Sequence, residues 1–188
     1  MRLRFFSVLL VLAMLLTPLQ ASCADAEGLR QDALTALQAL GLFTQASYQM
    51  DELPALTEHT PKGRVRYAVY SPDQQSALLQ ICDAQGECIS MALQIDGGME
   101  GELADSAVCA LLCAIEPDVF DADKAEEALQ SMRNIHAYHE RLASQLDAVN
   151  GTKTEHAVYA SYFTDAMMYE LTDSFFYANN RACLAETP

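Results

Sequence analysis

Apolar residues recur at helical spacing in three stretches of the chain. The first covers 26–42, where the apolar positions include Leu29, Ala33, Leu34, Leu37 and Leu40. The second, 102–115, is apolar on nearly all sides, as expected of a helix inside a core. The third begins at a cap residue, Asp121 or Asp123, and ends at Asn150-Gly151. Its apolar stripe consists of Ala125, Ala128, Leu129, Met132, Ile135, Leu142, Leu146 and Val149. We therefore predict two amphipathic helices and one buried central helix.

Two-residue alternation replaces the helical period between residues 64 and 95. The first strand places Val65, Tyr67 and Val69 on one face and ends at the turn Ser71-Pro72-Asp73. The next two strands turn their apolar positions toward the core, and these are Ala77, Leu79 and Ile81, then Ile89, Met91, Leu93 and Ile95. Residues 44–63 contain two prolines and are expected to be a connector. The pattern predicts a three-stranded antiparallel meander.

The segment 155–177 has apolar residues in pairs every four positions, beginning with Val158/Tyr159. This spacing favours a helix to about Ala178, antiparallel to the preceding helix. The residues are also strand-prone, so a β-hairpin that turns at Thr164-Asp165, giving two further strands, is the alternative. The fold class that we predict is a single α+β domain over 27–188. It contains an N-terminal helix, the meander, the buried helix and a long C-terminal helical hairpin that covers the sheet.

The first 26 residues have the order of a secretory signal peptide: Arg2 and Arg4, an apolar run over 5–16, then small residues. Twelve residues rise only about 18 Å as a helix, which is too short for a bilayer of about 30 Å. Cleavage is expected after Ala24 or Ala26, and lipidation at Cys23 is the alternative, although Gln20 stands where such sites have leucine. We therefore expect an extracytoplasmic protein, periplasmic or secreted, or else a membrane-anchored lipoprotein. No later stretch is long and apolar enough for a membrane span.

Export makes disulfides chemically accessible to the five cysteines of the mature chain. In the predicted meander, Cys82 and Cys88 lie together on the outer face, at the two mouths of the loop 83–87. Directly opposite residues of antiparallel strands come close to disulfide distance. We therefore predict a Cys82–Cys88 disulfide. The cysteines of the central helix, Cys109 and Cys113, are expected to be buried, and at most one of them to reach Cys183.

The formal net charge of −15 narrows the choice of partners. Cleavage after Ala26 leaves 9 basic and 25 acidic residues, a net charge of −16. Such a chain repels nucleic acid and anionic membrane surfaces. The expected partner is an unknown protein. The negative charge either attracts a basic surface on that protein or serves solubility alone.

Few residues have the spacing of an active site. His139-Glu140-Arg141-Leu142-Ala143 begins like the zinc motif H-E-x-x-H but has Ala143 in place of the second histidine. His136 and His139 lie three residues apart and would need ligands from elsewhere to hold a metal ion. No P-loop, no nucleophile elbow and no C-x-x-C motif is present. We therefore predict no catalytic, cofactor or metal residues.

Two functional classes remain. The first is an exported non-catalytic binding or interaction module with an acidic surface. The second is a small exported hydrolase or thiol enzyme, in which Cys109 or Cys113 would meet a histidine that the fold brings near. The missing motifs favour the binding module.

Overall fold

The computed structural model describes residues 25–54, 63–73, 76–99, 101–152 and 158–184. In chain order the elements are α2 (Ala26–Ala39), β1 (Ser47–Glu52), β2 (Arg64–Tyr70), β3 (Ala77–Ala84), β4 (Glu87–Ile95), α3 (Glu102–Ile115), α4 (Ala122–Asn150), β5 (Ala160–Phe163), β6 (Met167–Leu171), β7 (Phe175–Asn180) and α5 (Arg181–Leu184). The predicted signal peptide and the alternative of lipidation at Cys23 fall on residues outside the described ranges, apart from Asp25 and Ala26.

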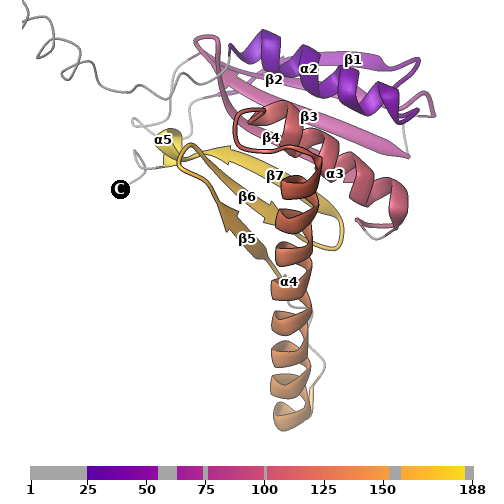
Figure 1. The fold of residues 1–188 in the computed structure, drawn as a ribbon, viewed down its shortest axis with the longest axis vertical. Helices are drawn as coiled ribbons and strands as arrows, with labels where there is room; N and C mark the ends of the chain where they lie inside the picture. The colour runs from indigo at the N-terminus through magenta and orange to yellow at the C-terminus, as the bar shows by residue number, and fades with distance from the viewer. Residues whose placement is uncertain (1–24, 55–62, 74–75, 100, 153–157, 185–188) are drawn as a thin grey trace, which may run out of the picture.

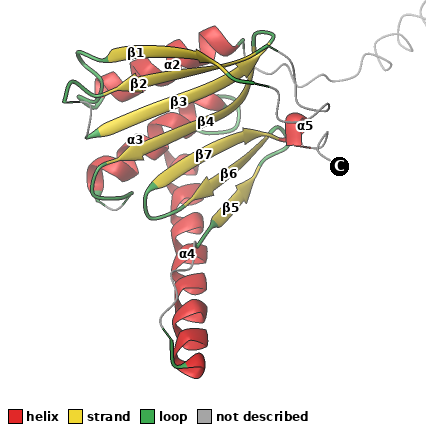
Figure 2. Cartoon of the chain, turned by 180° about the vertical axis from the view of Figure 1, so that it is seen from behind, coloured by secondary structure: helices red, strands yellow, loops and turns green. Residues whose placement is uncertain are grey.

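The strands form one antiparallel sheet of seven in the order β1-β2-β3-β4-β7-β6-β5. Helices α2, α3 and α4 lie on one of its faces, and the strands lie in front of them when the molecule is seen from behind (Figures 1 and 2). The meander β1–β4 and the meander β5–β7 meet where β4 pairs with β7. The chain therefore has two layers, with the apolar core between the helices and one face of the sheet.

The predicted three-stranded meander is wrong because the sheet continues on both sides of it. On one side, β1 lies within the segment 44–63 that we expected to be a connector, and it pairs with β2 from Ser47 opposite Tyr70 to Glu52 opposite Val65. Five of its six residues are exposed. An edge strand of this kind is held by its backbone pairing to β2. Its two apolar side chains, Tyr48 and Met50, alternate with polar ones but are both exposed, so the strand has no apolar face in the core.

The predicted C-terminal helical hairpin is also wrong, because residues 160–180 form strands β5, β6 and β7. The β-hairpin that turns at Thr164-Asp165 is closer to what the chain forms, although three strands are present and not two. In β6 and β7 the buried residues alternate, and they are Met167, Tyr169, Leu171, Phe176, Ala178 and Asn180. Residues four apart lie on the same face in a helix and also in a strand. The spacing in the sequence therefore could not separate the two structures.

The three longer helices agree with the predicted ones in position, within three residues at each end. Helix α2 ends at Ala39, just before Gly41, which has a positive φ of 84°. The side chain of Asp121 caps α4 by accepting a hydrogen bond from the Lys124 amide at 2.9 Å. At its other end α4 stops at Gly151, whose left-handed φ of 72° suits glycine.

Two polar clusters join the layers. The Arg133 guanidinium of α4 donates hydrogen bonds to the Asp105 carboxylate of α3 and to the backbone carbonyl of Met99. At the C-terminal end of α3, the Glu116 carboxylate accepts hydrogen bonds from the Tyr169 hydroxyl at 2.6 Å and from the Thr164 hydroxyl at 2.8 Å. These contacts fix the first half of α4 and the β5–β7 meander against α3.

Candidate functional sites on helix α4

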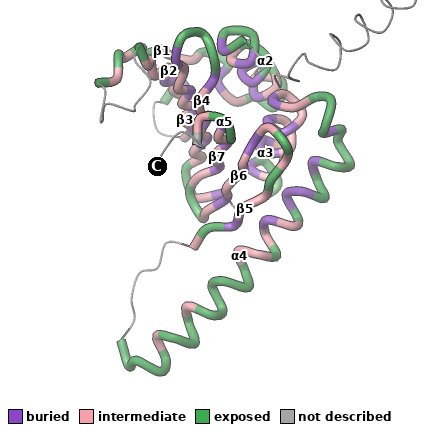
Figure 3. The backbone as a smooth tube through the Cα atoms, turned by 90° about the vertical axis from the view of Figure 1, so that its left-hand side faces the viewer, coloured by how far each residue is buried: buried purple, intermediate pink, exposed green. Residues whose placement is uncertain are grey.

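Helix α4 has a buried half and an exposed half. Its 29 residues make a rod of about 43 Å. All of its buried residues lie in the first half, and they are Ala125, Ala128, Leu129 and Met132. From Ala137 to Asn150 no residue is buried, and this part of the helix extends away from the sheet (Figure 3). We call residues 137–150 the arm.

The arm carries an apolar stripe on one side. Tyr138, Leu142, Leu146 and Val149 are exposed by 54%, 41%, 59% and 84%. Their spacing of four, four and three residues places them on one face of a helix. From the sequence we expected the segment 155–177 to form a helix antiparallel to this one. Since that segment forms strands, the described part of the chain leaves these side chains exposed.

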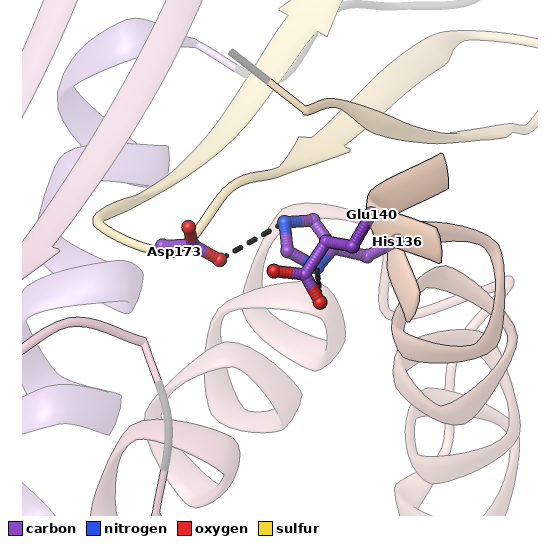
Figure 4. A group of neighbouring side chains, drawn as sticks. All are labelled: His136, Glu140 and Asp173. Atoms are coloured by element: carbon purple, nitrogen blue, oxygen red, sulfur yellow. Dashed lines mark ion pairs between the residues drawn. The ribbon is translucent and has the colours of Figure 1, made fainter. Parts of the chain in front are cut away.

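A second candidate site lies where the arm meets the body of the protein. His136 and Glu140 come from α4, one turn apart, and Asp173 comes from the turn between β6 and β7 (Figure 4). The His136 Nε2 atom is 3.0 Å from Asp173 Oδ1, and its Nδ1 atom is 3.8 Å from Glu140 Oε2. The His136 side chain is only 12% exposed, whereas Glu140 and Asp173 are exposed by 53% and 69%.

The backbone around Asp173 is held at a fixed place. Thr172 closes the turn by two hydrogen bonds with Phe175, one from its backbone amide and one to its hydroxyl oxygen, each of 2.9 Å. The Asp173 carbonyl accepts a hydrogen bond from the Met99 amide. Gly98 lies so close that a Cβ atom there would be 2.5 Å from the same carbonyl oxygen. The turn after β4 therefore positions Asp173 beside α4.

The two histidines that we singled out in the sequence have different surroundings. His139 Nδ1 lies 3.0 Å from the Tyr159 carbonyl oxygen, and His139 is not part of the group around His136. Sequence reasoning missed Asp173, because its approach depends on the β6–β7 hairpin that was taken for a helix. The signal that could have found it is the run Thr172-Asp173-Ser174, which is typical of a turn.

The predicted Cys82–Cys88 disulfide is not formed in the structure, in which Cys82 is a free thiol. The register shifts between Cys82 and Asp83, so Cys82 lies opposite Ser90 and Asp83 lies opposite Cys88. Ile89 is the extra residue of this bulge, and it moves Cys88 to the buried face. The parity argument for the disulfide is therefore wrong. The disulfide itself stays a prediction, which peptide mapping without reduction would test.

The thiols of α3 lie in a groove between α3 and α4. Burial raises the pKa of Cys109, and Cys113, Asp105 and Glu126 raise it further. Burial also raises the pKa of Cys113. Both side chains are therefore neutral thiols at pH 7, which are poor nucleophiles. Among the described residues that line the groove, none is a histidine. The thiol enzyme that we weighed from the sequence gains no support from this arrangement.

None of the helices in the described ranges has the length and apolar character that crossing a membrane requires. No protein-family model, curated protein or solved structure matches the chain.

Proposed function

We propose that the chain is an exported, non-catalytic binding module that holds a protein partner through the apolar stripe of the arm. The observation that carries this proposal is the exposure of Tyr138, Leu142, Leu146 and Val149 on one side of a projecting helix. Contiguous exposed apolar surface is the usual mark of a protein-binding site, and an amphipathic helix commonly binds by laying such a face into an apolar groove.

The charge of the chain favours a partner with a basic surface around an apolar groove. Residues 137–150 contain one arginine, one aspartate and one glutamate, a net charge of −1 with neutral histidine, whereas the whole chain has −15. The arm therefore suits an apolar contact, and the rest of the molecule supplies the long-range attraction. Salt should slow the association of such a pair more than it speeds dissociation.

Export is part of the proposal, and the described residues bear on the cleavage site. The Ala26 side chain is buried, and its amide donates a hydrogen bond of 2.8 Å to the Gly86 carbonyl. Asp25 forms a β-bridge with Glu87. Cleavage after Ala24 retains these contacts and cleavage after Ala26 removes them, which supports Ala24. The intact mass of the protein purified from its own host tests this, because a chain beginning at Asp25 and one beginning at Glu27 differ in mass.

The partner-binding proposal is tested by photo-cross-linking from single positions of the arm. A cross-linking residue at Leu146 lies within the stripe, and one at Ser144 lies on the other side of the same turn. We expect a specific adduct from Leu146 in the native host and none from Ser144. Equal labelling from both positions, or no adduct from either, would contradict the proposal. An adduct with twice the chain mass would show self-association in place of a separate partner.

A matched variant separates binding from folding. Leu142→Gln, Leu146→Gln and Val149→Gln together remove the stripe with a residue that favours helices. Because Leu146 is replaced in this variant, the cross-linking residue stands at Tyr138 in both the variant and its parent. We expect the adduct from Tyr138 to be lost in the variant. The free energy of unfolding should change by no more than about 1 kcal/mol, because surface substitutions usually have small effects. A cooperative loss of structure would show that the stripe belongs to the core of the protein.

A further inference from the structure

We infer that His136, Glu140 and Asp173 form a binding site for a divalent transition-metal ion of the zinc class. The inference goes beyond the proposed function and does not depend on it. Each residue offers one ligand atom, and the three atoms lie within 4.8 Å of one another. One imidazole and two carboxylates make a donor set that zinc-class ions accept.

The distances are near those of a metal site before its ion is bound. Zinc lies about 2.0–2.2 Å from nitrogen and oxygen ligands, so two ligands of one ion are separated by about 3–3.5 Å in tetrahedral geometry. The 3.0 Å between His136 Nε2 and Asp173 Oδ1 is already close to this separation. The Glu140 carboxylate lies nearer the other ring nitrogen, 3.8 Å from Nδ1, and its half-exposed side chain must turn toward Nε2 to complete the site.

The direction of the His136 ring supplies a second observation. Its Nε2 atom is buried and makes no hydrogen bond, although Asp173 Oδ1 is 3.0 Å away. The two atoms are therefore in contact, but an N–H bond at Nε2 would not point at the Asp173 oxygen. Two ligands of one metal ion have this relation, because the lone pair of each points at the ion and not at the other ligand. A buried nitrogen without a directed partner is otherwise unfavourable.

The three ligands are fixed to different degrees. His136 is held by burial, and the backbone of Asp173 is held by Thr172 and Met99. Glu140 completes the set from the next turn of α4. With three protein ligands, the fourth position of a tetrahedral site is left for water.

The test is Zn²⁺ titration of the folded mature protein by calorimetry, with Mg²⁺ as the comparison ion. We expect one Zn²⁺ per chain and no comparable binding of Mg²⁺. Asp173→Asn and Glu140→Gln should each weaken Zn²⁺ binding by about tenfold or more, since even the outer residues of metal sites have effects of this size. His139→Gln is the matched control on the same helix, and it should bind Zn²⁺ as the wild type does.

Stability gives a readout that does not depend on the calorimeter. At a Zn²⁺ concentration of one hundred times Kd, the Tm should rise by about 5–10 °C in the wild type and in His139→Gln. Asp173→Asn should show no comparable rise. His136→Gln replaces a mostly buried side chain and can unfold the protein, so the two carboxylate variants carry the test.

The cysteines are the competing source of Zn²⁺ binding. Co²⁺ distinguishes them, because thiolate ligands give intense near-ultraviolet charge-transfer absorption and nitrogen and oxygen ligands do not. We expect Co²⁺ spectra without that absorption. Its presence, equal Zn²⁺ affinity of wild type and Asp173→Asn, or no binding by the wild type would each overturn the site. None of these outcomes affects the partner-binding proposal, because that proposal is tested by cross-linking at Leu146 and Ser144.

Discussion

Replacing Gly98 by alanine tests how the β6–β7 turn is held beside α4. Gly98 has a φ of +90°, and a Cβ atom added there would meet the Asp173 carbonyl oxygen at 2.5 Å. The preceding residue, Gly97, is the matched control. Its φ is +81°, and a Cβ atom there would have nothing within 4 Å. The two variants therefore share the backbone strain and differ only in the close approach.

The size of the difference follows from these contacts. A left-handed φ costs alanine about 1–2 kcal/mol relative to glycine, in both variants. In Gly98→Ala the turn must also move from 2.5 Å to the 3.4 Å of ordinary contact. This motion breaks the hydrogen bond from the Met99 amide to the Asp173 carbonyl, which adds about 1–3 kcal/mol because Met99 is buried. We expect Gly98→Ala to be the less stable variant by that second amount.

Urea unfolding followed by far-ultraviolet circular dichroism measures both free energies on the same chain. The proposed metal site gives a second readout, since displacement of Asp173 should weaken Zn²⁺ binding in Gly98→Ala and not in Gly97→Ala. Equal free energies of unfolding for the two variants would refute the argument. That result would mean that the turn after β4 does not hold Asp173 in place.

Two further predictions concern the polar contacts of the fold. Tyr169→Phe removes one of the two hydrogen bonds to Glu116 and should cost about 1.5–3 kcal/mol in urea unfolding, as expected for a bond to a charged acceptor. Burial and Glu116 raise the pKa of Tyr169, so in an alkaline absorbance titration this tyrosine should ionise only as the protein unfolds. The hydrogen bond from the Lys124 amide lowers the pKa of Asp121, so the stability from this group is present above its unfolded pKa of about 3.9 and is lost as pH falls through the lower folded value. Asp121→Asn keeps the cap without the titration, and its stability difference from the wild type should shrink below about pH 4; a difference that is constant with pH would contradict this.

The longer helices and the strands β2–β4 were predictable because their apolar positions follow one period over many residues. Strand β1 was not, since Ser47–Glu52 buries almost none of its side chains and depends on β2 for its backbone hydrogen bonds. In the segment 160–180, a four-residue repeat fits both a helix and a strand. Only the alternation of buried Tyr169 and Leu171 with half-buried neighbours separates them, and that is a property of the folded sheet.

The candidate sites failed to emerge from the sequence for a related reason. The apolar stripe of the arm was visible only as the continuation of the stripe that begins at Ala125, so the sequence did not distinguish its exposed half from its buried half. His136 was visible as well, but its partner Asp173 lies 37 residues later and reaches it only through the hairpin and Gly98. One extra residue, Ile89, was enough to separate Cys82 from Cys88. Local periodicity thus describes elements, whereas sites depend on register and on the contacts between elements.

The two candidate sites have independent evidence, but they meet at one point of α4. His136 directly precedes Ala137, where the arm begins, and its mostly buried side chain contacts Asp173 at the base of the arm. The arm is about 21 Å long, and a tilt of about 10° at its base would move its tip by about 4 Å. A bound ion that fixes His136 to Asp173 would restrict this tilt. If restricting the tilt favours the arm direction that binds the partner, Zn²⁺ must raise the affinity for the partner. The partner must then raise the affinity for Zn²⁺ by the same factor, because coupling between two sites is reciprocal. Measuring both factors, with Asp173→Asn as the uncoupled control, would decide whether the metal site and the apolar stripe are coupled or independent.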